Sequence, residues 1–77
     1  MTPYEAMQKM NAGYRYAYYN IKTNKVVSVH RDWDQAWSKV ERTSGYKQAA
    51  DYCDDEFMTH DVISLFDIAF HNAMAVA

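Results

Sequence analysis

The apolar and polar positions between residues 14 and 30 follow a different pattern from those in the rest of the chain. β-Branched and aromatic residues dominate two runs, YRYAYYN and KVVSVH, which are separated by the polar residues 22–25. This composition is typical of strands, and a short polar break between two such runs is typical of a hairpin turn. The sequence therefore predicts an antiparallel β-hairpin over residues 14–30.

A helix is predicted before the hairpin. Thr2 and Glu5 have the spacing of a capping box, in which each side chain bonds the other residue's backbone N–H. Pro3 stands at the first helical position, where proline is favoured, and Gly13 is placed to end the helix.

Three further helices are predicted after the hairpin, because apolar residues recur there at spacings of three and four. The second helix starts at Asp32 and closes at Gly45, the third covers residues 46–58, and Thr59 caps a fourth that runs toward the C-terminus. The fourth helix carries an unusually wide apolar stripe, formed by Val62, Ile63, Leu65, Phe66, Ile68, Ala69, Phe70, Ala73 and Met74.

These elements predict an α+β fold in the order αββααα, with residues 1–77 as one small domain. The alternative is a small, mostly α-helical bundle. A helix that is apolar over so much of its girth lies in the core or at a subunit contact. A two-stranded sheet also leaves edges that another chain can pair with. We therefore expect a homodimer.

Composition limits which cellular compartment and which cofactors the chain is consistent with. Cys53 is the only cysteine of the 77 residues, which excludes an intrachain disulfide and favours a reducing compartment. The N-terminal residues lack the pattern of a signal peptide, and no apolar run is long enough to span a bilayer. We expect a cytoplasmic protein that does not enter the membrane. The three histidines show no metal-ligand spacing, so no metal or cofactor is expected.

Catalytic motifs are scarce. Neither glycine lies in a phosphate-binding loop, and no serine stands in a nucleophile turn. Cys53 falls on the apolar face of the predicted third helix beside acids, which favours a structural role. A strip on the predicted fourth helix is read either as a metal or proton-handling face or as its solvated side. This strip comprises His60, Ser64, Asp67 and His71. We expect no enzymatic activity, and a small metal-dependent enzyme is the least favoured alternative.

Charge is distributed unevenly along the chain. Residues 1–47 hold all eight Lys and Arg and four acids, a net charge of +4, whereas residues 48–77 hold six acids without Lys or Arg, a net charge of −6. Asp54, Asp55 and Glu56 fall in the last turn of the predicted third helix, where the helix dipole disfavours negative charge. Reversal of Asp54 and Asp55 is therefore expected to leave the fold intact. The unevenness has three interpretations: the basic half folds against the acidic half, the acids merely help solubility, or the acids bind a partner.

The tyrosines of the hairpin also have two interpretations. In strand geometry Tyr14, Tyr16 and Tyr18 share one face. Such a face is either a core wall or a contact surface, because aromatic rings with a polar tip suit both.

Three functions remain open. The first is a small protein-binding inhibitor or adaptor that docks an acidic patch on a basic partner surface and blocks a nucleic-acid site there. Its expected contact residues are Asp51, Asp54, Asp55, Glu56, Tyr16 and Tyr18. The second is a nucleic-acid binder using the hairpin tyrosines and nearby cations, which the overall acidity disfavours. The third is a small metal-dependent enzyme. In size and composition the chain resembles the small proteins that phages and mobile elements encode to bind host or defence machinery.

Overall fold

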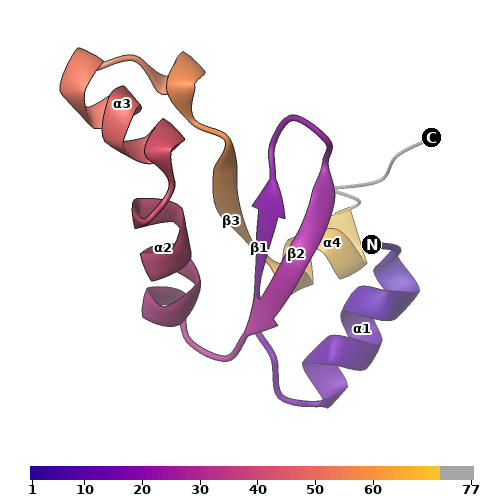
Figure 1. Ribbon diagram of the computed structural model, residues 1–77. Helices are drawn as coiled ribbons and strands as arrows, with labels where there is room; N and C mark the ends of the chain where they lie inside the picture. The colour runs from indigo at the N-terminus through magenta and orange to yellow at the C-terminus, as the bar shows by residue number, and fades with distance from the viewer. Residues whose placement is uncertain (72–77) are drawn as a thin grey trace.

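The computed structural model describes residues 1–71, which form a three-stranded antiparallel sheet with helices on both faces (Figure 1). In chain order the elements are α1 (Pro3–Asn11), β1 (Tyr16–Asn20), β2 (Lys25–His30), α2 (Trp33–Glu41), α3 (Ser44–Tyr52), the 3₁₀ turn η1 (Asp55–Phe57), β3 (His60–Ser64) and α4 (Leu65–His71). The predicted α+β class, with an N-terminal helix, a hairpin and then further helices, is confirmed. The mostly α-helical alternative is not what the chain forms.

The first helix begins and ends as its sequence predicts. The Thr2 hydroxyl accepts from the Glu5 N–H at 3.2 Å, and the Glu5 carboxylate accepts from the Thr2 N–H at 3.3 Å. These hydrogen bonds stabilise the carboxylate and hold the pKa of Glu5 below its usual value. Gly13 follows the helix with a φ of +98°, a left-handed conformation that glycine adopts without strain.

The sheet has the order β2-β1-β3, so β1 is the central strand. A bulge interrupts the hairpin, because Tyr18 pairs with Ser28 while Tyr19 pairs with Val26. The extra residue, Val27, lets Val26 and Val29 both pack on the same face of the sheet.

Residues 60–64 form a strand, so the predicted helix from Thr59 onward is wrong over these residues. They pair with β1, with Tyr18 opposite Val62. The Leu65 N–H donates to the Arg15 carbonyl at 2.9 Å, so pairing continues to the first residue of α4. One edge of the hairpin is therefore covered, unlike the two free edges that we expected. Ala73 and Met74, assigned to the same helix, lie outside the described residues.

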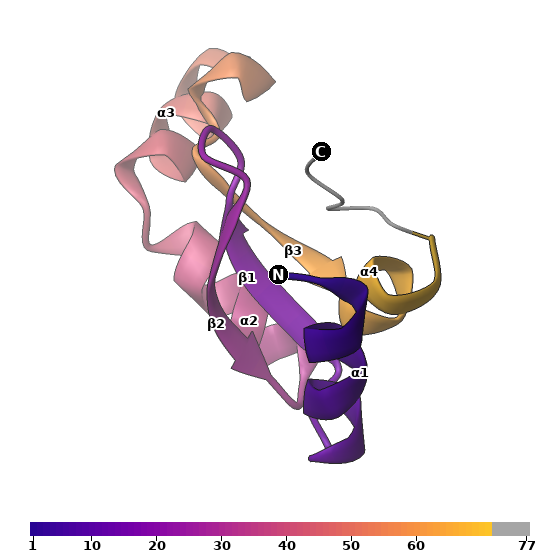
Figure 2. The same cartoon turned by 90° about the vertical axis from the view of Figure 1, so that its right-hand side faces the viewer.

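The helices form a layer on each face of the sheet (Figures 1 and 2). On one face α2 covers a cluster whose buried members are Tyr18, Ala36, Val40 and Val62. On the other face α1 and α4 pack together over a second cluster, whose buried members are Ala6, Ala17, Leu65 and Ile68. Each cluster is small because the sheet has only three strands to cover.

The boundary between the second and third helices also differs from the prediction. α2 ends at Glu41, and the Thr43 hydroxyl then caps α3 by accepting from the Tyr46 N–H at 3.2 Å. Gly45 consequently lies in the first turn of α3 and does not close α2.

Candidate partner-binding site

The segment after α3 projects from one end of the molecule, at the top of Figure 1. Among the described elements, α3 contacts η1 extensively and α2 only slightly. We call residues 51–57 the acidic tip. All seven of its residues are exposed, namely Asp51, Tyr52, Cys53, Asp54, Asp55, Glu56 and Phe57. The acidic tip is therefore exposed along its whole length.

The chain reverses direction at Cys53, which ends α3 earlier than the predicted position 58. Cys53 has a left-handed backbone with φ 51°, and the N–H groups of Cys53 and Asp54 both donate to the Ala49 carbonyl. This geometry is a common helix C-terminus. It also places Cys53 on the surface, so the prediction that this thiol is buried on an apolar face is wrong.

The three consecutive acids do not lie in the last turn of a helix, contrary to the prediction. The Asp54 carboxylate accepts from the Glu56 N–H at 3.0 Å and caps η1, while Asp55 and Glu56 form the first turn of η1. Negative charge at the start of a helical turn is favourable, not unfavourable. The helix-dipole argument for reversing Asp54 at no structural cost therefore does not hold, because its side chain caps the turn.

Internal contacts fix the acidic tip against the body of α3. The rings of Tyr52 and Phe57 lie 5.4 Å apart between centroids, tilted by 35°. Gly45 approaches the Phe57 carbonyl so closely that a Cβ at this position would overlap the oxygen. The acidic tip is thus a defined shape that the chain presents before any partner arrives.

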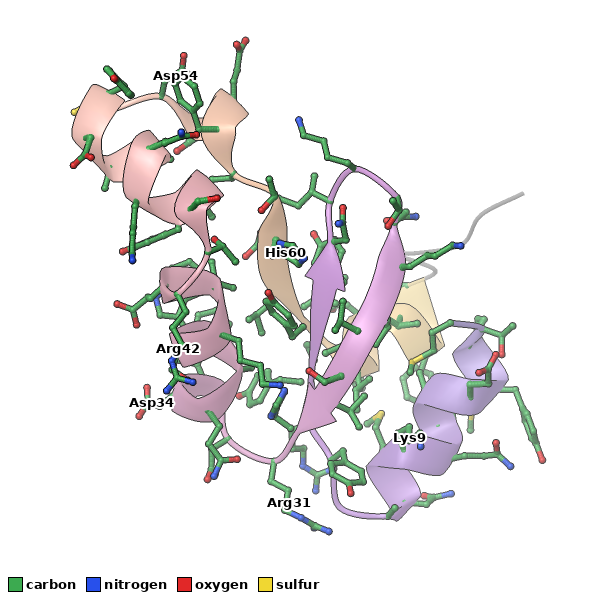
Figure 3. The ribbon with its side chains drawn as sticks, in the orientation of Figure 1. Lys9, Arg31, Asp34, Arg42, Asp54 and His60 are labelled. Carbon is green, nitrogen blue, oxygen red and sulfur yellow. The ribbon has the colours of Figure 1, made fainter. Side chains whose placement is uncertain are left out.

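Four carboxylates of the acidic tip are unpaired within the described chain. Among residues 1–71 no hydrogen bond joins Asp51, Asp54, Asp55 or Glu56 to a Lys or Arg side chain. Figure 3 shows Asp54 at one end of the molecule, with Arg31 and Lys9 near the other. The basic half therefore does not fold against these acids, and the first interpretation of the uneven charge fails for this cluster.

Tyr16 and Tyr18 lie elsewhere, beneath α2, so the structure does not bring them together with the acids. Tyr18 is only 8% exposed, its ring stacks on that of His60 at 4.9 Å, and burial raises the pKa of its hydroxyl. Tyr16 packs edge-on against Trp33 at 5.7 Å. Both tyrosines therefore fit the core-wall interpretation of the tyrosine face and not the contact-surface interpretation.

The predicted tyrosine face is incomplete, because Tyr14 precedes β1 and packs with the opposite cluster. The Arg31 guanidinium covers its ring, 4.7 Å from the centroid. The cations of the nucleic-acid interpretation are all exposed, namely Lys9, Arg15, Lys22, Lys25 and Arg31. The hairpin tyrosines Tyr14, Tyr16 and Tyr18 are buried or covered, however, so they do not give these cations the open stacking platform that this interpretation requires.

The predicted strip of polar residues along the last helix does not exist. His60 and Ser64 belong to β3, whereas Asp67 and His71 belong to α4. Among residues 1–71 no group of three or more His, Cys, Asp and Glu side chains could hold a metal ion.

The sequence did not predict that the aromatic residues of the acidic tip, Tyr52 and Phe57, are exposed. Tyr52 is 70% exposed, and Phe57 is exposed although the helical spacing placed it in the core. One signal was available: Tyr52 falls outside the apolar stripe of the predicted third helix and directly follows Asp51. A large aromatic residue in that position is more typical of a contact than of a core.

No helix within the described part of the chain is long and apolar enough to cross a membrane. Comparison of the chain with protein families, curated proteins and solved structures found no match.

Proposed function

We propose that this protein is a small non-catalytic binding module, an inhibitor or adaptor, that docks its acidic tip on a basic protein surface. The observation that carries the proposal is the composition of this projection. Four exposed carboxylates and two exposed aromatic rings share seven residues, and contacts within the projection hold them in place.

The carboxylates supply attraction at long range. No Lys or Arg follows residue 47 in the sequence, and the four carboxylates outnumber Lys47, the cation one turn before Asp51 on α3, so the field around the acidic tip is net negative. Charge clusters of one sign steer an oppositely charged partner and raise the association rate, an effect that salt weakens.

The aromatic rings supply contact area at short range. Tyr and Phe side chains bury large apolar surfaces at low conformational cost, and aromatic residues are enriched at the centres of interfaces. Tyr52 and Phe57 already contact one another, so little rotamer freedom is lost when a partner covers them. Acids around an aromatic pair give a polar rim around an apolar centre.

Proteins that bind nucleic acid do so through basic surfaces. A rigid acidic projection that occupies such a surface competes with the phosphate backbone for the same cations. This competition would make the protein an inhibitor of a nucleic-acid-binding partner.

The proposal is tested by affinity capture from the source cell or its host, followed by quantitative mass spectrometry. The test variant is Asp51→Lys with Asp55→Lys, which spares the capping carboxylate of Asp54. The matched control is Asp34→Lys with Glu41→Lys, an equal charge change at two exposed acids of α2.

We expect the wild type and the α2 control to capture the same basic protein, and the tip variant to lose it. Capture by the folded tip variant at the wild-type level would overturn the proposal. Loss of capture by both variants would also overturn it, because net charge and not the acidic tip would then control binding.

A further inference from the structure

A second exposed surface lies on the opposite side of the sheet, on the layer formed by α1 and α4. Tyr4 and Met7 of α1 are 69% and 43% exposed, and Phe66 and Phe70 of α4 are 50% and 56% exposed. The two helices pack against one another, and their buried residues face the sheet. These four side chains therefore lie on the outer side of the layer, and we call them the outer helix face.

The rings on α4 are already arranged as a group. Phe66 and Phe70 lie 4.8 Å apart between centroids, and the ring of His71 lies 5.6 Å from that of Phe66. Aromatic side chains that contact one another before binding lose little rotamer freedom when they are covered.

We propose that a second copy of this chain covers the outer helix face, so that the protein is a symmetric dimer. At 150–250 Å² per aromatic side chain, the three rings leave roughly 300–400 Å² exposed. A stable interface buries about 800 Å² on each partner, with an apolar centre. The outer helix face is the right size for that centre, and the polar residues around it complete the area.

The charged residues of this surface are compatible with binding to a second copy of the same surface. A two-fold interface brings the same patch of each subunit together, so the patch must complement itself. The two helices carry charges of both signs in Glu5, Lys9 and Asp67. The acidic tip carries one sign only and would repel its own copy.

The small core gives a further reason for a second copy. The large side chains that are fully buried in the described chain are Leu65, Ile68 and Val40. Domains of this size commonly gain the missing burial by oligomerisation. A dimer through α1 and α4 also leaves the acidic tip free, because the tip lies beyond α2 on the other side of the sheet (Figures 1 and 2). The proposed dimer therefore stands independently of the proposed function.

Light scattering coupled to size-exclusion chromatography, across the micromolar range, tests the dimer. We expect a dimer for the wild type, and a dissociation constant raised by about tenfold or more in Phe66→Asp and in Tyr4→Asp, because a charge enters the apolar centre. The control is Val27→Asp on β2, where a residue of similar exposure, 59%, lies on the remaining free edge of the hairpin. The control should remain dimeric.

Circular dichroism of each variant separates loss of the dimer from loss of the fold. In mixed labelled and unlabelled wild-type protein, we also expect isotope-filtered NMR contacts between the Phe66 ring of one copy and residues of α1 or α4 of the other. A monomeric wild type throughout the micromolar range would overturn the proposal. Dissociation by Val27→Asp, with Phe66→Asp and Tyr4→Asp still dimeric, would also overturn it and place the contact at the sheet edge.

Discussion

Gly45, in the first turn of α3, lies directly against the carbonyl oxygen of Phe57, the last residue of η1. A Cβ at position 45 would overlap this oxygen and would also press on the Thr59 side chain at 3.1 Å. Position 45 is buried, so the chain returning from the acidic tip crosses α3 at this point. The absence of a side chain at residue 45 thus allows the tip to fold back onto the helix that carries it.

Gly45→Ala is predicted to displace the acidic tip. The obstructing atom is backbone, which cannot rotate away, so the added methyl costs about 1–3 kcal/mol of unfolding free energy. Thermal unfolding and amide chemical shifts of residues 51–57 would measure both effects. Ser44→Ala, an exposed change in the same turn, is the control. Unchanged tip shifts in Gly45→Ala would show that the close approach does not exist in solution.

The change from strand to helix at Ser64 and Leu65 has a testable consequence. Leu65 is fully buried whereas its neighbour Phe66 is half exposed. Leu65→Ala is therefore predicted to cost about 2–5 kcal/mol of unfolding free energy, and Phe66→Ala considerably less. Urea unfolding at concentrations where the oligomeric state is the same for both variants gives the comparison. Equal costs would contradict the burial of Leu65 and the exposure of Phe66 at the start of α4.

His30 makes stability depend on pH. Burial, and secondarily the nearby Lys39 charge, hold the pKa of His30 below its usual 6.5. The unfolded chain therefore binds a proton on His30 at a higher pH than the folded chain does. Stability is full above pH ~6.5 and is lost as the pH falls through the lower pKa of the folded state.

Replacement of His30 by Gln should remove this part of the pH dependence. Urea unfolding of the wild type and of His30→Gln, at several pH values between about 7 and 5, would measure the difference in slope. The control is His71→Gln, at an exposed position on α4. If the wild type and His30→Gln lose stability equally over this range, His30 is not the group responsible.

The elements that sequence predicted correctly are those with local signals. The capping box of Thr2 and Glu5 and the left-handed Gly13 bound α1 through contacts between near neighbours. The hairpin was predicted from its β-branched and aromatic composition. Nothing local, however, indicates the bulge at Val27, which depends on the pairing of β2 with β1.

The largest error, the helix predicted over residues 60–64, concerns a contact between distant segments. Residues 60–64 form a strand because β1 offers them a free edge, and the helical spacing of Val62, Leu65 and Phe66 is coincidental. A local signal was present, because Ser64 and Asp67 have the spacing of a capping box, and the Ser64 hydroxyl accepts from the Phe66 N–H at 3.1 Å. The charge distribution along the sequence identified the acidic residues of the site. It did not predict the projecting turn on which they lie.

The most direct test of the proposed function is the rate at which the captured basic protein associates with the wild type, measured at several salt concentrations. We predict a fast association that slows steeply with salt, as expected when a charged cluster steers the encounter. The variant Asp51→Lys with Asp55→Lys should associate at least about tenfold more slowly at low salt and show little salt dependence. The control variant, Asp34→Lys with Glu41→Lys, should behave as the wild type does. An unchanged rate and salt dependence in the folded tip variant would contradict binding through the acidic tip.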